Sequence, residues 1–166
     1  WGNQNTDDST NLQGPAFLAI ANNEVFITDT YRHQVLVFST EGDLLRLWGS
    51  EGSGLGQLNQ PLGIALASSG LVYVADSRNH RVQVFTSTGQ FVRSWGSLGQ
   101  ENGQFTTPFG ITVAVDGLVY VTDTALEGEP FIENHRVQVF TETGQFVRKW
   151  RLGATADDPL FFPTDI

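Results

Sequence analysis

One stretch of the chain decides the fold: it runs from residue 61 to residue 95 and reads PLGIALASSGLVYVADSRNHRVQVFTSTGQFVRSW. It holds four short runs rich in β-branched and aromatic residues, separated by Ser, Gly and Asn clusters that favour turns. The first run, from Gly63 to Ala67, is small and apolar, as a strand in a crowded interior must be. The last, from Phe91 to Trp95, mixes apolar and charged residues, which suits an edge strand. The pattern predicts a four-stranded antiparallel sheet.

The same pattern recurs along the chain. Units open with Trp at positions 1, 48, 95 and 150, so the spacings are 47, 47 and 55 residues. Each complete unit repeats a proline, a β-like run ending in Asp and a later run ending in Phe: Pro15, Asp29 and Phe38; Pro61, Asp76 and Phe85; Pro108, Asp123 and Phe140. Pro163 starts a fourth, incomplete unit. A period of about 40 to 50 residues with four short β-like runs is typical of a propeller blade.

The second unit resembles the NHL repeat. The resemblance rests on the following residues: Pro-x-Gly-Ile from Pro61, Val-Tyr-Val-Ala-Asp ending at Asp76, Asn79-His80-Arg81 and Gly89. The first unit departs from the pattern, because Phe17 stands where the second has Gly63. It also has Arg32-His33-Gln34 in place of Asn-His-Arg.

The resemblance implies an all-β propeller of the NHL type in a single domain over residues 1–166. Its three four-stranded antiparallel blades would span approximately residues 15–60, 61–107 and 108–162. NHL domains usually close with five or six blades, so three blades form a partial ring or part of a larger one. The end blades would then lack a neighbour and expose apolar faces that soluble monomers avoid. We expect these faces to be covered by a second copy, by other subunits or by further repeats.

Composition indicates a folded globular protein and excludes several classes of partner. The 166 residues are 40% hydrophobic and 11% aromatic. Eighteen acidic against nine basic residues give a net charge of −9, which opposes binding to nucleic acid. There is no apolar run long enough to span a membrane. The chain has no Cys, so cysteine usage does not indicate the compartment; an acidic, Thr- and Gln-rich repeat favours an extracytoplasmic or cell-surface location.

The ionisable residues of the repeat favour structural over catalytic roles. His33, His80 and His135 occupy equivalent positions, so we expect them on separate blades, too far apart to share one metal ion. The Asp that ends each second run is expected to bind turn amides, or Arg81 and Arg136. Asp7-Asp8 and Asp157-Asp158 lack the alternating ligand pattern of a calcium loop, so we expect solvated loops there. No catalytic, cofactor-binding or metal-binding residue is assigned.

One insertion breaks the repeat. Residues 124–133 read TALEGEPFIE, an insertion of eight residues relative to the second unit. In a four-stranded antiparallel blade, the loop between the second and third strands emerges on the same face as the connection between blades. Apolar residues in such a loop are candidate contacts, although packing back onto the blade is equally open. The candidate partner-binding residues are Leu126, Glu127, Glu129, Phe131, Ile132 and Glu133.

The leading functional hypothesis is a non-enzymatic scaffold that binds a protein, peptide or glycan through its loop face. A second hypothesis is a self-assembly module whose blades are completed by neighbouring chains. A third, implied by the resemblance alone, is an NHL-like propeller lyase with a metal site. The sequence offers no repeat-breaking set of polar residues for such a site. We expect no cofactor, no nucleic acid and no membrane insertion, and we leave self-association open.

Overall fold

The structure, a computed structural model, describes residues 11–124 and 134–151. Blade 1 consists of β1 (Pro15–Ala21), β2 (Glu24–Asp29), β3 (Gln34–Ser39) and β4 (Leu44–Trp48). Blade 2 consists of β5 (Pro61–Leu66), β6 (Val72–Asp76), the 3-10 turn η2 (Ser77–Asn79), β7 (Arg81–Phe85) and β8 (Phe91–Trp95). Blade 3 consists of β9 (Thr107–Val113), β10 (Val119–Thr124), β11 (Arg136–Phe140) and β12 (Phe146–Arg151).

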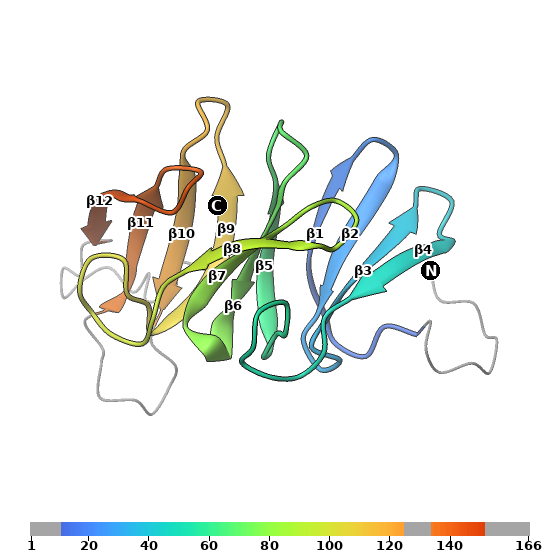
Figure 1. Cartoon of the computed structure of the whole chain (residues 1–166), viewed down its shortest axis with the longest axis horizontal. Coiled ribbons are helices and arrows are strands. Elements are labelled where there is room, and N and C mark those ends of the chain that lie inside the picture. The colour runs from blue at the N-terminus through green and yellow to red at the C-terminus, as the bar shows by residue number, and fades with distance from the viewer. Residues whose placement is uncertain (1–10, 125–133, 152–166) are drawn as a thin grey trace, which may run out of the picture.

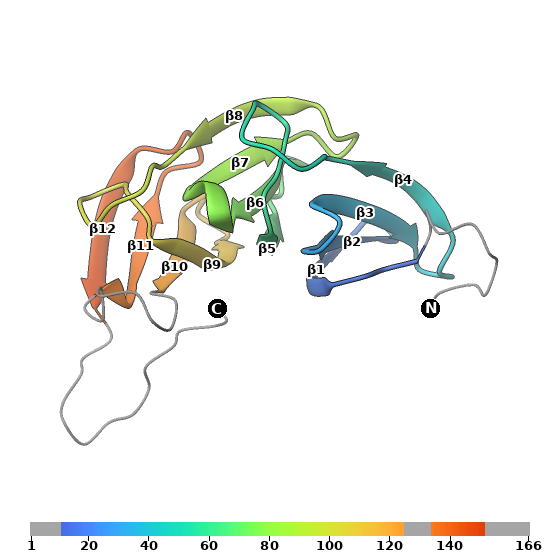
Figure 2. The same ribbon diagram turned by 90° about the horizontal axis from the view of Figure 1, so that it is seen from below.

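The three blades are antiparallel sheets with their strands in chain order. They stand side by side (Figure 1) and form an arc, with β1, β5 and β9 innermost and β4, β8 and β12 outermost (Figure 2). The prediction of an all-β fold with three four-stranded antiparallel blades is confirmed. Within the described ranges, helix is limited to short 3-10 turns, and no helix is long and apolar enough to cross a membrane.

The hydrophobic cores lie between neighbouring blades. The middle strands of blade 2 pack against a blade on either side, so all five residues of β6 are buried. This explains why the second and third runs of each unit are not simply alternating in polarity. The core between blades 1 and 2 consists of Phe26, Val35, Val37, Trp48, Leu58, Ile64, Val72, Val74 and Phe85. The core between blades 2 and 3 includes Tyr73, Val82, Val84, Phe105, Ile111, Val119, Val121 and Phe140.

The innermost strands approach one another closely, which accounts for the glycine at the start of the second unit. A Cβ atom at Gly63 would collide with the carbonyl oxygen of Phe109 on β9. Blade 1 has Phe17 at the equivalent position, and its ring packs edge-to-face on Phe109 with 5.5 Å between centroids. The departure of the first unit from the repeat is therefore accommodated by an aromatic contact.

A tryptophan and a glycine form a repeated contact between blades. A Cβ atom at Gly89, in the β7–β8 turn, would lie 2.7 Å from the Trp48 ring of blade 1. A Cβ atom at Gly144, in the β11–β12 turn, would lie 2.7 Å from the Trp95 ring of blade 2. Both glycines have a positive φ, 85° and 87°. The turn of each following blade thus lies directly on the outer-strand Trp of the blade before it.

We expect Gly89→Ala to lower the free energy of unfolding by about 2–4 kcal/mol, since it adds overpacking against Trp48 to backbone strain. Gly70→Ala is the matched control. Gly70 has a φ of 80° but no atom within 4 Å of a built Cβ, so its cost is strain alone, about 1–2 kcal/mol. Urea denaturation of both variants measures the difference. Equal losses would contradict the Trp–Gly contact.

Candidate functional site

One face of the arc carries the long connections between blades together with the turns between second and third strands. The connections span residues 49–60 and 96–106, and both lie at the lower side in Figure 1 with the η2 turn. The β1–β2, β5–β6 and β9–β10 hairpins lie at the opposite side. We call the first surface the connection face, and this arrangement agrees with the one expected from antiparallel topology.

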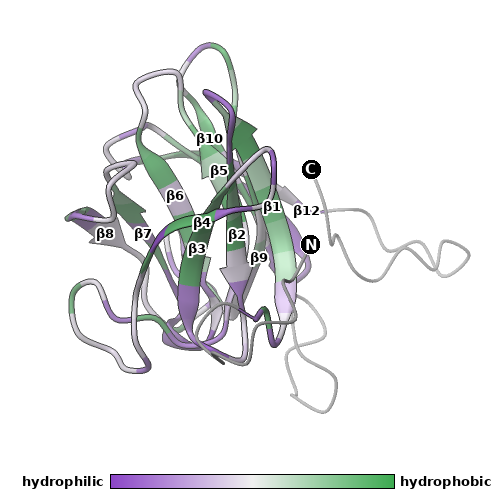
Figure 3. Ribbon diagram, turned by 90° about the vertical axis from the view of Figure 1, so that its right-hand side faces the viewer, coloured by the Kyte–Doolittle hydropathy of each residue, from purple (hydrophilic) through white to green (hydrophobic). Residues whose placement is uncertain are grey.

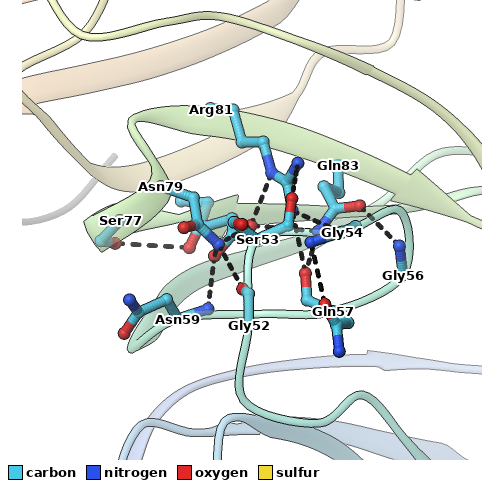
Figure 4. A network of polar contacts seen from close by, with 12 residues as sticks. Gly52, Ser53, Gly54, Gly56, Gln57, Asn59, Ser77, Asn79, Arg81 and Gln83 are labelled. Carbon is cyan, nitrogen blue, oxygen red and sulfur yellow. Dashed lines mark hydrogen bonds and ion pairs between the residues drawn. The ribbon is translucent and has the colours of Figure 1, made fainter.

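A network of polar contacts joins the first connection to blade 2, and Figure 4 shows Arg81, Asn79 and Gln83 within it. It is built around Asp76, at the end of β6, which is fully buried. Its Oδ1 accepts a hydrogen bond from the Asn59 amide at 2.7 Å, and its Oδ2 accepts one from Arg81 Nε at 2.7 Å. Asn79 Nδ2 donates to the same carboxylate, as does Gln83 Nε2 at 3.0 Å. The carboxylate thus orients the side chains that meet the connection.

Arg81 and Gln83 then bind the backbone of the connection. The Arg81 guanidinium donates to the carbonyls of Ser53 at 2.9 Å, Gly54 at 2.8 Å and Gln57 at 3.0 Å. Gln83 Nε2 donates to the Gln57 carbonyl at 2.6 Å. The Arg81 bonds are charge-assisted, which makes them stronger than hydrogen bonds between neutral groups. We call Asp76, Arg81 and Gln83 the clamp of blade 2.

Blade 3 repeats the clamp with Asp123, Arg136 and Gln138. Asp123 Oδ1 accepts from the Thr107 amide at 2.9 Å, and its Oδ2 accepts from Arg136 Nε at 3.1 Å. Arg136 and Gln138 each donate to the Gln104 carbonyl at 2.6 Å. Burial raises the pKa of Asp123 to about 6, although Arg136 and the backbone amides act to lower it. The expected pairing of Asp76 with Arg81 and of Asp123 with Arg136 is confirmed, whereas the backbone amides that bind the two carboxylates come from the start of the blade and not from the following turn.

Blade 1 keeps the aspartate but lacks the rest of the clamp. Asp29 accepts from the amides of Gln13 at 2.7 Å and Gly14 at 2.9 Å. Gln34 and Leu36 replace the clamp Arg and Gln, and the buried Leu36 packs in an apolar cluster with Leu12. The segment before blade 1 is therefore held by apolar contacts and backbone amides.

Two of the three histidines hold the backbone of the following connection. His33 Nδ1 accepts from the Gln60 amide at 3.0 Å. His80 Nδ1 lies 2.5 Å from the Thr106 carbonyl oxygen, to which its Nδ1–H tautomer donates. Burial lowers the pKa of His135. Across residues 11–124 and 134–151, no three His, Asp or Glu side chains gather as metal ligands would.

Three large apolar side chains are exposed on the connection face: Tyr31 (70%), Leu55 (69%) and Leu98 (62%). Sequence reasoning missed all three, although each departs from its own repeat. Tyr31 aligns with Arg78 of blade 2, Leu55 with Asn102 and Leu98 with Glu51. An apolar residue in one unit where another unit has a polar one was the available signal, because the fold does not require it.

Hydrogen bonds hold the backbone on both sides of each exposed side chain. On either side of Leu55, the Gly54 carbonyl accepts from Arg81 and the Gly56 amide donates to Gln83 Oε1 at 3.1 Å. On either side of Leu98, the Ser97 carbonyl accepts from the Phe105 amide at 2.9 Å and the Gly99 amide donates to the Phe105 carbonyl.

Tyr31 is held in the same way. The Thr30 amide donates to the Gly14 carbonyl at 2.8 Å, and the Arg32 amide donates to Asp29 Oδ1 at 3.2 Å. A fixed backbone lowers the conformational entropy lost when a ligand binds. The connection face therefore presents preorganised apolar anchors.

The partner-binding residues predicted from the sequence lie outside the described residues. They are Leu126, Glu127, Glu129, Phe131, Ile132 and Glu133. The acidic pairs Asp7-Asp8 and Asp157-Asp158 also lie outside the described ranges. Their roles stay predictions.

The repeat unit matches a known family. The family model for the NHL repeat matches residues 12–38 and 58–85, which cover β1 to β3 of blade 1 and β5 to β7 of blade 2. Two segments of the chain are thus NHL repeats. No curated protein matches the chain.

Solved structures similar to this NHL-repeat protein share its fold at low sequence identity. Virginiamycin B lyase from Staphylococcus aureus is 16% identical with a TM-score of 0.61, over 85% of this chain and 42% of the lyase. A protein of unknown function from Bacteroides caccae is 14% identical with a TM-score of 0.66, over 91% and 52% of the two chains. A chain of the nidogen/laminin complex is 17% identical with a TM-score of 0.62, over 86% and 49%. This chain thus spans about half the length of those proteins, and the likeness shows the propeller fold alone.

Proposed function

We propose that the protein is a non-enzymatic scaffold that binds a protein, peptide or glycan through the connection face. The observation that carries the proposal is the set of exposed Tyr31, Leu55 and Leu98 side chains, each on a backbone held on both sides by hydrogen bonds. Aromatic and aliphatic side chains on rigid backbone are typical anchors of binding surfaces. The proposal treats the chain as one domain with blades at about 15–60, 61–107 and 108–162.

The insertion after β10 extends the same proposed surface. It follows Thr124 at the end of β10, the position at which η2 follows β6. We include Leu126, Glu127, Glu129, Phe131, Ile132 and Glu133 in the binding surface on this ground. With a net charge of −9, the protein favours partners that are neutral or basic around an apolar contact.

The ionisable side chains of the face support a non-enzymatic role. Asp76 and Asp123 accept hydrogen bonds from backbone amides and from Arg81 and Arg136. The two guanidinium groups in turn donate to carbonyls of the connections. A lyase with a metal site is the alternative suggested by the likeness to virginiamycin B lyase. Metal analysis of the purified protein separates the two, because stoichiometric metal would favour the lyase. An extracytoplasmic or cell-surface location is also part of the proposal, and cell fractionation tests it.

The binding test compares the two faces of the molecule. Peptide-display and glycan-array ligands are selected on the unaltered protein and then titrated against the triple variant Tyr31→Ser, Leu55→Ser, Leu98→Ser. We expect affinity to fall at least about 100-fold, since a buried anchor contributes about 2 kcal/mol or more. The control is Val115→Ser on the opposite face, where Val115 is fully exposed in the β9–β10 hairpin.

The control variant is expected to bind as the unaltered protein does. Ligands that bind the triple variant with unchanged affinity, or that lose affinity for Val115→Ser instead, would contradict the connection face as the binding surface. A melting temperature close to that of the unaltered protein shows that the triple variant is folded, because all three side chains are solvent-exposed.

A further inference from the structure

The outer strands of blades 1 and 2 each carry an arginine that binds the next blade. Arg46 Nε on β4 donates to the Ser87 carbonyl in the β7–β8 turn at 2.9 Å. Arg93 Nε on β8 donates to the Glu142 carbonyl in the β11–β12 turn at 3.0 Å. Ser87 and Glu142 each stand two residues before the turn glycine that lies on the outer-strand Trp. Arginine, tryptophan and the facing turn together form an interblade lock, and it occurs at both interfaces.

Blade 3 carries the arginine and tryptophan of this lock without a following blade among the described residues. Arg148 on β12 is exposed, and the bond given for it runs to Tyr120 Oη of its own blade at 3.2 Å. Trp150 is 39% exposed, whereas Trp48, which is covered by blade 2, is 9% exposed. The outer strand of blade 3 therefore presents the donor half of a lock.

Blade 1 carries the receiving half of a lock, which is its β3–β4 turn. Its β3–β4 turn has Gly42 with a φ of 100°, close to those of Gly89 and Gly144, and Thr40 is the equivalent of Ser87. On the innermost strand, Leu18 is 59% exposed, whereas its equivalents Ile64 and Ile111 are 5% and 6% exposed against a preceding blade. In an end-on view of blade 1, β1 is largely apolar (Figure 3).

The two halves are also complementary in charge. Arg148 and Lys149 lie together on β12, and Glu41 and Asp43 flank Gly42 in the blade 1 turn. Opposite charges at the two ends favour contact between blade 3 of one copy and blade 1 of another over contact between identical ends.

We propose that a second copy of this chain completes the arc by head-to-tail docking. Arg148 and Trp150 of each copy engage the 40–42 turn of the other, and Leu18 packs against the last blade of that copy. Two arcs joined in this way have six blades and the same interface twice, so the ring closes without a free end. The proposal shares the propeller fold with the proposed scaffold function but uses different residues, so either can fail alone.

The first test measures the mass of the 166-residue chain by sedimentation equilibrium across a dilution series. A dimer of about 36 kDa, twice the 18.2 kDa chain, is the expected result. Arg148→Glu is expected to weaken dimerisation at least tenfold. The matched charge reversal Arg78→Glu, on the connection face, should leave dimerisation unchanged, since Arg78 bonds to Gln60 within the same chain.

The second test uses mixing to establish the head-to-tail geometry. Leu18→Asp should also abolish the dimer, because it places a charge in the apolar part of the interface, and Val115→Asp is its control. A mixture of Arg148→Glu with Leu18→Asp retains one intact donor half and one intact receiving half, so it should form a heterodimer through a single lock. At the concentration at which the mixture associates, each variant alone should be monomeric, and each should keep the circular dichroism spectrum of the unaltered protein.

Three outcomes would overturn the proposal. The first is a folded monomer at all concentrations with no dye-binding apolar surface. The second is a dimer unaffected by Arg148→Glu and Leu18→Asp, and the third is a mixture of the two variants that fails to associate. If the ends are covered instead by further repeats in a longer chain, the 166-residue chain stays monomeric, and that result also counts against the second copy.

Discussion

Asp123→Asn is expected to lower the free energy of unfolding by about 3–5 kcal/mol, because it leaves a buried arginine without its counter-charge. Arg136 is 1% exposed, and its Nε lies 3.1 Å from Asp123 Oδ2. Denaturation in urea measures the loss.

Asp29→Asn is the control for this variant. Asp29 is equally buried, but the bonds described for it come from the backbone amides of Gln13, Gly14 and Arg32. An Asn side chain keeps one acceptor oxygen for them, so we expect a loss of about 1–2 kcal/mol. Similar losses in the two variants would show that the buried ion pair adds nothing to the backbone bonds.

Arg136→Met is expected to make the free energy of unfolding depend on pH through Asp123. Burial already raises the pKa of Asp123 to about 6, and removing Arg136 removes an influence that lowers it. An acid with a raised folded pKa binds its proton more tightly when folded, so the stability of this variant should increase as the pH falls from 7 towards 5. Asp123→Asn cannot titrate there, so its deficit relative to the unaltered protein should not shrink in the same way. Parallel urea series at the two pH values test the difference.

Phe105→Ala is expected to destabilise the protein by about 3–5 kcal/mol, the range for removing a large buried aromatic side chain. Phe105 lies in the connection between blades 2 and 3, yet it is fully buried, and its ring centroid lies 5.6 Å from that of Phe140. The equivalent Leu58 is buried between blades 1 and 2. Each connection thus places one apolar side chain in the core between its blades.

Leu98→Ala is the matched variant within the same connection. Leu98 pairs with Phe105 through the backbone, but its side chain is exposed. Shortening this side chain to Ala should therefore lower the free energy of unfolding by no more than about 0.5 kcal/mol. Thermal and urea unfolding of the two variants compare them directly. A comparable loss at Leu98 would mean that its side chain is covered and is not an anchor for a ligand.

Most of the fold could be predicted from the sequence because a repeat constrains it three times. The runs that end at Asp29, Asp76 and Asp123 are all second strands, since each must bury both faces between blades and so needs the same apolar residues. The pairing of two of these carboxylates with Arg81 and Arg136 was also correctly expected, because Asn-His-Arg recurs before the third run in the second and third units, although the eight-residue insertion changes its distance from the Asp.

The candidate site was less predictable, because its geometry depends on backbone atoms. Arg81 and Arg136 bind carbonyl oxygens of the connections, and a carbonyl is the same in every residue, so no sequence pattern marks the acceptor. Exposure has no marker within a single unit: Leu55 and Leu58 are three residues apart in one connection, and only the first is exposed. Comparison with the next unit separates them, since Asn102 aligns with Leu55 and Phe105 with Leu58.

The sequence by itself determined that this chain forms three four-stranded antiparallel blades, because the runs that pair as strands recur in the same order every 47 to 55 residues. Only the tertiary structure decided which side chains of the connection face reach solvent. It alone decided that Arg148, Trp150 and Leu18 stand at the open ends of the arc with the two halves of an interblade lock. Both depend on how blades stack, and stacking joins residues about one whole repeat apart, beyond the reach of any local pattern.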